Sequence, residues 1–538
     1  GLAPDAGLFE DTLDVRFQFG DGLVLELAEV HDVNRALHRP GECDRMGEGP
    51  LTAPRGVHRD QYLHTGTYHR PLVKRLPGRP EGECRPPVGG SPVRRFDALN
   101  RDHRDVPAVI GIVVSRADEA SAHIGAQLLD LADWDRVEEG VYRRPGFELR
   151  EFDPLHLELD RVGEAFEDPA FVVFASRHSG ETGPLLSAHY TGNFGSAEYG
   201  GAPRELSEPA PNALKHVIQA LDREAPADYD VAMECTHHGP TDHAVPGLFV
   251  ELGSAEPQWE DPDAARAVAR AILSLEGVAA RDGQTIVAFG GNHYAPRPTR
   301  LLLETSYSVG HVAADWSLEE LGDPDQNRAL LEQLFESSGA ECAIFDGEQQ
   351  AIRKIVTELG YRVVSETWVR ETSDVDPTLV EAIESSLGSV DSGLRFGSIR
   401  PPESTFEIVE MPAELLAECH GIDAGTTVEA VSERVVAYQT QESGTLVGEQ
   451  VAVADGTAYA EIVSALQEVL ERAYDAVRRE GTTVVAEREA FDPGAAAELG
   501  VPEGPDFGTL ANGNPVTVDG ERVDPEAVHV TEIRRFEV

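Results

Sequence analysis

The sequence predicts an α/β fold in which a mainly parallel sheet is covered on both faces. From Val109 onward, short apolar runs alternate with amphipathic stretches that have helical spacing. The apolar runs show little alternation of apolar and polar residues, which is typical of parallel strands buried on both faces. Functional side chains in such sheets gather at the carboxyl ends of the strands. Polar clusters follow several of the predicted strands at that point.

Five strands and five helices are expected between Val109 and Gly360. The strands are Val109–Ser115, Phe171–Ala175, Val231–Glu234, Thr285–Phe289 and Cys342–Phe345. The helices are Glu119–Leu131, Asn212–Leu221, Asp263–Leu275, Asn327–Phe335 and Glu348–Leu359. Pro262 near the start of one helix and Gly360 after another agree with the residues that usually begin and end helices.

The pattern is weaker beyond Pro377. A segment rich in Glu and Val extends to Gly456, a long amphipathic helix is expected at Tyr459–Glu480, and short strands follow near the end. We therefore expect an α/β domain over residues 109–376. Residues 377–538 are expected to hold an acidic insertion and a smaller C-terminal α+β region.

The 538-residue chain carries a large excess of acidic side chains. It has 96 Asp and Glu against 45 Lys and Arg, a net charge of −51, and only three of the basic residues are lysines. Such a charge repels anionic partners in dilute buffer. At molar salt, however, the Debye length falls to about 3 Å. The composition therefore indicates a protein of a halophilic cell and says little about the ligand.

Residues 1–108 differ from the rest of the chain. The first 105 residues have a net charge of −2 and the remainder −49, and apart from a short apolar run at Val24–Val30 there is no sustained periodicity. One hypothesis is an over-extended reading frame, with Val109 encoded by an alternative start codon. The other is a disordered N-terminal arm. We assign this segment no function.

Composition excludes several classes of protein. An apolar fraction of 41% can build cores, which excludes a disordered acidic tail, and collagen-like, coiled-coil and disulfide-scaffold proteins are excluded too. No apolar run approaches the roughly 20 residues that span a bilayer. Five scattered cysteines fit a reducing compartment. We expect a cytoplasmic monomer with no membrane partner.

Four clusters that contain histidine follow predicted strands or their neighbouring loops. In the first, over residues 176–193, His178 and Glu181 have the H-x-x-E spacing that lets an imidazole and a carboxylate meet one cation. The alternative is an exposed loop with a capping Glu. Arg177, His189 and Asn193 of the same cluster are candidates for substrate binding.

The second cluster is Glu234 to His243. Adjacent side chains on a strand point to opposite faces, but a loop with Gly and Pro can turn both His237 and His238 inward. We interpret these two histidines as metal ligands or catalytic groups. Cys235 is interpreted as a small buried residue rather than a ligand.

The third and fourth clusters follow later predicted strands. The amides of Gly290 and Gly291 could hold an anion or a developing oxyanion, although a turn that needs glycine is the alternative. His293 follows them, and Arg297 and Arg300 are placed to meet a phosphate. His311 alone is more often structural, yet histidines from several strand ends are how zinc hydrolases collect ligands. The chain has no P-loop, G-x-G-x-x-G, H-E-x-x-H or G-x-S-x-G motif.

These motifs together resemble the archaeal-type D-aminoacyl-tRNA deacylases. The resemblance rests on five segments: 110–115, 176–193, 234–240, 290–297 and 499–505. It covers essentially all of residues 109–538 and agrees with Val109 as the start. The acidic stretch around residues 370–460 departs from the family and resembles an expansion.

The resemblance implies a zinc-dependent hydrolase that cleaves the ester between a D-amino acid and the terminal adenosine of tRNA. It implies a three-layer α/β fold related to phosphorylase-like and peptidyl-tRNA hydrolase folds, with two zinc ions per chain. Residues 109–376 are then the catalytic domain. The motifs leave a metal-ligand set to be inferred: His178, Glu181, His237, His238, His293 and His311.

In the mechanism expected from these residue types, zinc lowers the pKa of a bound water to about 7, and hydroxide attacks the ester carbonyl. Glu234 or Glu181 would act as general base. The amides of Gly290 and Gly291, or the metal, would stabilise the oxyanion. The acceptor-end phosphates would be held by arginines, namely Arg177, Arg297 and Arg300.

Two other functions share part of this chemistry. A zinc carboxypeptidase or amidohydrolase acting on a small substrate would use the same His and Glu residues without tRNA contacts. A nucleic-acid-binding protein with structural zinc fits less well, because closed structural sites usually favour cysteine.

Overall fold

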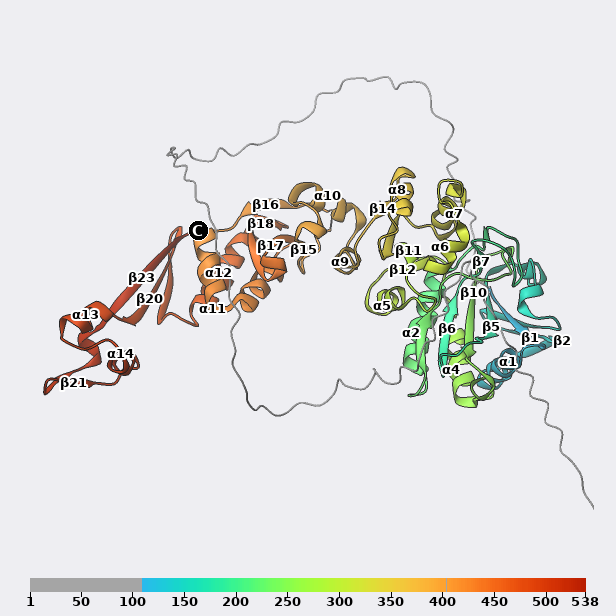
Figure 1. Ribbon diagram of the computed structural model, residues 1–538, viewed down its shortest axis with the longest axis horizontal. Helices are drawn as coiled ribbons and strands as arrows, with labels where there is room; N and C mark the ends of the chain where they lie inside the picture. Colours follow the sequence, from blue (N-terminus) through green and yellow to red (C-terminus); the bar gives the residue numbers. More distant parts are fainter. Residues whose placement is uncertain (1–108, 403) are drawn as a thin grey trace, which may run out of the picture. The chain divides into compact units, whose positions relative to one another are not determined.

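The structure is a computed structural model that describes residues 109–402 and 404–538 (Figure 1). The two hypotheses for residues 1–108, and the apolar run at Val24–Val30, lie outside the described residues. The domain boundaries predicted at residues 109, 376 and 377 remain predictions.

An eight-stranded mixed sheet carries most of the polar clusters. Its strand order is β2-β3-β4-β1-β5-β10-β6-β9. Strands β4, β1, β5 and β10 are parallel, β6 is antiparallel to β10 and parallel to β9, and β2-β3-β4 form an antiparallel meander. The strands are β1 (Val109–Ser115), β2 (Asp135–Glu138), β3 (Val141–Arg144), β4 (Phe147–Phe152), β5 (Pro169–Arg177), β6 (Leu185–His189), β9 (Asp230–Met233) and β10 (Gly247–Gly253). The predicted parallel strands are thus confirmed, within a sheet that also contains antiparallel pairs.

The two faces of this sheet are covered differently. Helices α1 (Glu119–Leu131), α2 (Pro211–Glu224) and α4 (Pro262–Leu273) bury their apolar sides in a core with alternate residues of the strands. On the other face, aromatic and aliphatic side chains of β1, β5 and β10 pack against Val162 and Phe166. These two residues belong to the loop between β4 and β5. The three-layer arrangement and the named fold stay predictions.

A second, all-parallel sheet has the order β12-β11-β13-β14. Its strands are β11 (Thr285–Gly290), β12 (Ser308–Ala313), β13 (Cys342–Asp346) and β14 (Arg362–Val363), and the helices of this region are α5 (Pro296–Glu304), α6 (Asp315–Leu321), α7 (Arg328–Ser338), α8 (Gln350–Glu358) and α9 (Glu366–Glu371). The five predicted strands therefore belong to two sheets rather than one. The two sheets meet just after β9, where the amides of Cys235 and Thr236 donate to the carbonyls of His293 and Val312, both at 2.8 Å.

The remaining short elements of this half are β7 (Gly192–Asn193), β8 (Glu205–Leu206) and α3 (Glu256–Trp259). No helix among the residues that the structure describes is long and apolar enough to cross a membrane.

The C-terminal region is folded as mixed α and β structure, as predicted. A sheet of order β15-β17-β18-β16 shares a core with α11 and α12, and a three-stranded sheet β19-β20-β23 follows. The elements are α10 (Pro377–Leu387), β15 (Leu394–Phe396), β16 (Glu407–Glu410), α11 (Ala413–Ser432), β17 (Ala437–Gln441), β18 (Leu446–Val453), α12 (Thr457–Leu470), β19 (Ala476–Glu480), β20 (Thr483–Phe491), α13 (Pro493–Glu498), α14 (Pro505–Ala511), β21 (Val516–Val518), β22 (Glu521–Val523) and β23 (His529–Glu537).

The long helix predicted at Tyr459–Glu480 is wrong in its second half. The helix ends at Leu470, and Ala476–Glu480 form a strand paired with β20 across a turn at Gly481 (φ 66°). Arg478 forms an ion pair at 2.8 Å with Glu487, its diagonal neighbour across this pair. Cross-strand pairing therefore overrides the helical spacing of the polar residues.

Candidate metal centre and active site

The clustered side chains lie on the face of the eight-stranded sheet opposite to α1, α2 and α4. Phe249 and Glu251 alternate along β10 with apolar residues that pack in the helix-covered core. His189 lies beside Phe249 on the antiparallel neighbour β6. Other members of the cluster come after the carboxyl ends of strands, as expected from the sequence: His178 follows β5, Glu234, His237 and His238 follow β9, and His293 follows β11. Because β6 runs antiparallel to β10, the cluster forms across the face of the sheet as well as at its rim.

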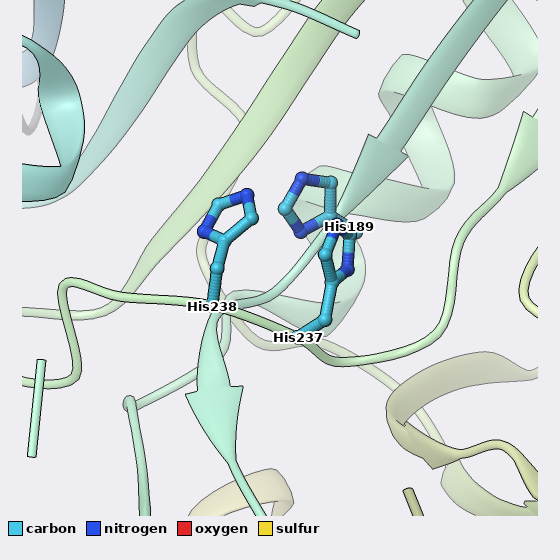
Figure 2. A group of neighbouring side chains, drawn as sticks. All are labelled: His189, His237 and His238. Atoms are coloured by element: carbon cyan, nitrogen blue, oxygen red, sulfur yellow. The ribbon is translucent and has the colours of Figure 1, made fainter. Parts of the chain in front are cut away.

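Three histidines hold their rings in the same tautomer. Nδ1 of His189, His237 and His238 lies 3.1, 2.8 and 2.7 Å from the backbone carbonyls of residues 190, 235 and 239. A carbonyl only accepts hydrogen bonds, so each Nδ1 carries a hydrogen, and in the neutral form of each ring Nε2 keeps its lone pair. Figure 2 shows the three rings gathered together.

The ring nitrogens of the same three histidines lie close enough together to hold one metal ion. One ring nitrogen from each lies within 4.8 Å of those of the other two. Nε2 of His189 is buried without a hydrogen-bond partner among the described residues. Burial, with the neighbouring histidines, lowers the pKa of His237 well below its usual value and that of His238 to about 4. Neutral imidazole nitrogens that face one point are the donors that zinc prefers, so these residues fit the metal.

Two buried carboxylates provide negative charge next to this trio. Glu234 and Glu251 are 0% and 3% exposed. Burial would lower the pKa of His178, but Glu234 and Glu251, at 3.1 and 3.5 Å from its Nδ1, raise it to about 11. Glu251 also approaches Nε2 of His189 at 3.5 Å and raises its pKa against the effect of burial. His178, Glu234 and Glu251 also bring one donor atom each within 4.8 Å of one another, so the assignment of His178 as a metal ligand stays a prediction.

His293 connects the buried carboxylate Glu234 with the solvent-accessible space. Its Nε2 lies 2.7 Å from Oε2 of Glu234, and its side chain is 28% exposed. Its Nδ1 lies 3.5 Å from Sγ of Cys235. Cys235, His237 and His293 also bring one donor atom each within 4.8 Å of one another. Burial raises the pKa of Cys235 to about 12, so its thiol is protonated at neutral pH.

These groups open onto a cavity of about 530 Å³. Its lining includes His178, His237, His238, Glu251 and His293. A cavity of this size holds a small organic group together with the end of a larger substrate. Buried carboxylates, neutral imidazoles and an accessible histidine are the components of a metal-assisted hydrolytic site.

Residues 165–364 match the family model described as D-aminoacyl-tRNA deacylase. A D-aminoacyl-tRNA deacylase of Natronomonas pharaonis is 49% identical over 440 residues, which is 80% of this chain and 100% of that protein. This chain belongs to the D-aminoacyl-tRNA deacylase family. A second member, from Halorubrum lacusprofundi, is 48% identical over 80% of this chain and 97% of its own length. The halophilic sources of both relatives agree with the salt-adapted composition.

One solved structure, described as a conserved protein of unknown function, aligns with a TM-score of 0.46 and 31% identity. It covers 50% of this chain and 99% of that chain.

Two predicted substrate-binding residues of this deacylase-family chain line the cavity. The guanidinium of Arg177 lies over the ring of Trp259 at 5.2 Å. Asn193 donates from Nδ2 to the carbonyls of Gly200 and Ala202 at 2.9 and 3.1 Å, and so holds the loop beside the cavity. The third, His189, belongs to the histidine trio.

Glu181 and His311 lie apart from the site, which corrects two predicted ligands. Glu181 is exposed on the loop after β5, and the partners of His178 are instead Glu234 and Glu251. His311 is fully buried, and both ring nitrogens are engaged, by Thr236 Oγ1 at 2.9 Å and the carbonyl of Ser207 at 3.0 Å. His311 therefore has a structural role.

The glycine pair at the end of β11 does not line the cavity. Gly290 and Gly291 have φ of 86° and 80°. A Cβ on Gly290 would lie 2.0 Å from the carbonyl oxygen of Asp346, and one on Gly291 would lie 3.0 Å from its carboxylate. The glycines thus allow a close backbone crossing, and an oxyanion there would meet a carboxylate.

The two arginines predicted to bind phosphate are already paired. Arg300 contacts Glu366 at 2.9 Å, and Arg297 contacts Glu366 at 3.3 Å and Asp346 at 3.5 Å. Neither lines the cavity of the histidine cluster. Arg297 and Arg300 therefore lie apart from the histidine cluster, and their contact with phosphate stays a prediction.

Glu251 is a site residue that the sequence analysis missed. It lies in β10, a strand that the analysis did not predict. The signal was present, because Glu251 is the single acidic residue inside the apolar run Gly247–Gly253. A charged residue in a fully buried strand needs a partner or a metal, and this rule could have found it.

Proposed function

We propose that this chain hydrolyses the ester that joins a D-amino acid to the terminal adenosine of tRNA, releasing free D-amino acid and tRNA. Its membership of the D-aminoacyl-tRNA deacylase family supports this substrate. The single observation that carries the hydrolytic chemistry is the fixed tautomer of His189, His237 and His238 beside a cavity. We place the reaction in the cytoplasm.

The residues that would hold zinc are His189, His237 and His238. A zinc ion there would supply a Lewis acid and lower the pKa of water to about 7. Glu251 adds a negative charge 3.5 Å from Nε2 of His189, which favours a cation at this position. A second zinc ion per chain stays a prediction, because in the neighbouring group of Cys235, His237 and His293 the thiol is protonated and His293 contacts Glu234.

We assign proton transfer to His293 and Glu234. His293 faces the cavity, so it can accept a proton from the attacking water and return it to the departing ribose oxygen. Glu234, 2.7 Å from Nε2 of His293, orients that ring. His178 keeps Glu234 ionised from the other side. Glu234 thus acts through His293, and Arg177 is the remaining candidate for contact with a phosphate.

The test is hydrolysis of matched D- and L-aminoacyl-tRNA in concentrated salt. We expect hydrolysis of the D-ester alone, loss of activity on chelation, and recovery with zinc. Equal hydrolysis of both esters, or cleavage of peptides instead, would reject the proposal in favour of a zinc carboxypeptidase or amidohydrolase. Activity that survives complete removal of metal would reject the zinc assignment.

A further inference from the structure

Two exposed aromatic side chains lie at the cavity that holds the histidine cluster. Large apolar side chains that are exposed among the described residues are few, and only Tyr199 (68% exposed) and Trp316 (37%) are aromatic. Both line this cavity. Exposed aromatic rings gathered at one cavity are typical of a binding surface rather than of random exposure.

Each ring is carried by an anchored backbone segment. The carbonyl of Tyr199 accepts from the amide of Gly239 at 2.9 Å, within the loop that carries His237 and His238. Trp316 follows Asp315, whose amide donates to the carbonyl of Gly291 at 2.9 Å. The rings therefore remain exposed although their backbones are fixed. This lowers the entropy lost when a flat ligand binds.

Trp316 lies beside the catalytic groups. Its ring is nearly parallel to that of His293, with an angle of 24° and 6.2 Å between centroids. In the proposed substrate the ester is carried by the ribose of the terminal adenosine, and the adenine is attached to the same ribose. A base that extends from an ester held near His293 therefore reaches the neighbourhood of Trp316.

The charged residues that line the cavity favour substrate recognition through uncharged groups rather than through phosphates. Arg177 is the only arginine or lysine among the described residues that line it, whereas Glu198 and Glu320 are both present. Burial and the charge of Glu198 raise the pKa of Glu320. Molar salt also screens contacts between arginine and phosphate. Stacking of an aromatic ring on an unpaired base needs no basic side chain and is not screened by salt, and it is the usual way to hold single-stranded RNA ends.

Building on the proposed function, we infer that Trp316 and Tyr199 form a stacking surface for the unpaired bases of the tRNA acceptor end, and that Trp316 takes the terminal adenine. Recognition at this cavity then depends on base stacking more than on phosphate contacts.

The kinetic test compares Trp316→Ala and Trp316→Phe on D-aminoacyl-tRNA and on the methyl ester of the same D-amino acid, which has no base. We expect Trp316→Ala to raise KM for the tRNA substrate about 5- to 100-fold, and Trp316→Phe to restore most of it. The ratio of kcat/KM between tRNA and methyl ester should fall accordingly. Tyr199→Ala and Tyr199→Phe should follow the same pattern. Val137→Ala, exposed but outside the cavity, is the control.

The binding test needs no turnover. An uncharged RNA oligonucleotide ending in CCA should quench tryptophan fluorescence, and an oligonucleotide whose last nucleotide is abasic should quench it much less. Trp316→Phe should abolish the difference. An equal loss on both substrates, or a loss that depends on the amino acid and not on the base, would overturn the inference. A wild-type chain that binds the oligonucleotide but hydrolyses no D-ester would reject the proposed function and leave the stacking surface standing.

Discussion

His238→Ala and His311→Ala form a matched pair that tests the metal centre. His311 is fully buried and His238 half-buried, and both have Nδ1 engaged, by Thr236 in His311 and by the carbonyl of Gly239 in His238. They differ at Nε2, which has no hydrogen bond among the described residues in His238 but lies 3.0 Å from the carbonyl of Ser207 in His311. Only His238 therefore offers a lone pair to a metal.

The expected loss of zinc affinity follows from the free energy that each ligand contributes. Structural zinc sites bind with roughly 10–16 kcal/mol of apparent free energy from four ligands, or about 2.5–4 kcal/mol for each ligand. His238→Ala should therefore weaken zinc binding about 100- to 1,000-fold and abolish D-ester hydrolysis, with the fold retained. His311→Ala should keep zinc binding but lower the free energy of unfolding by about 2–4 kcal/mol, since it leaves a cavity and an unpaired carbonyl.

The assay combines metal content after dialysis against a graded chelator, initial rates of D-aminoacyl-tRNA hydrolysis, and urea unfolding in concentrated salt. If His311→Ala lost the metal while His238→Ala kept it, the tautomer argument would be refuted. If both variants kept full activity, neither the trio nor its neighbourhood would be the active site.

Three further predictions concern single residues. Gly239→Ala should lower kcat/KM by about 100-fold. The added Cβ would lie 2.2 Å from the carbonyl carbon of Gly200 and would force apart the loops that carry His238 and Tyr199. Steady-state kinetics and metal content measure the effect, and unchanged rates would show that the close approach is dispensable. Acid should destabilise the wild type more than His311→Gln between pH 6.5 and 4. Burial lowers the pKa of His311 to about 4, so only the unfolded chain takes up a proton in that window, and about 3 kcal/mol is lost as the pH falls; parallel urea curves for the two proteins would contradict this. Arg300→Ala should leave KM for D-aminoacyl-tRNA within about twofold of the wild-type value, because Arg300 is bound to Glu366 outside the cavity. A large increase in KM would show that Arg300 contacts the substrate.

The strands and helices of the catalytic half could be predicted because their signals are local. The strand at Val109–Ser115 and the helix at Glu119–Leu131 have the predicted bounds, since apolar periodicity and the capping residue Asp118 act within a few residues. Strand β10 was missed, although its apolar run is as clear as that of β5. The division into two sheets could not be predicted, because it depends on long-range pairing after β9.

The sequence predicted which motifs form the site but not which residues contact each other within it. His237, His238 and His293 come together as expected because loops with glycine and proline follow their strands. Glu181 was assigned to His178 on spacing alone, whereas Glu234 and Glu251 reach His178 from other strands. Spacing in the sequence identifies only residues that are close along the chain, whereas a buried charged residue is paired with residues from distant segments.

Acidic composition and RNA binding are compatible in this chain because the site does not depend on free arginines. Carboxylates outnumber basic side chains by 96 to 45, so an arginine such as Arg300 is already paired, and a phosphate would have to displace a carboxylate. Metal coordination by neutral imidazoles and stacking by Trp316 involve no such competition, and both persist when salt screens charge. An enzyme that works in concentrated salt on an anionic substrate therefore gains most by recognising the uncharged groups of that substrate. The aromatic rings at the cavity are where this chain does so.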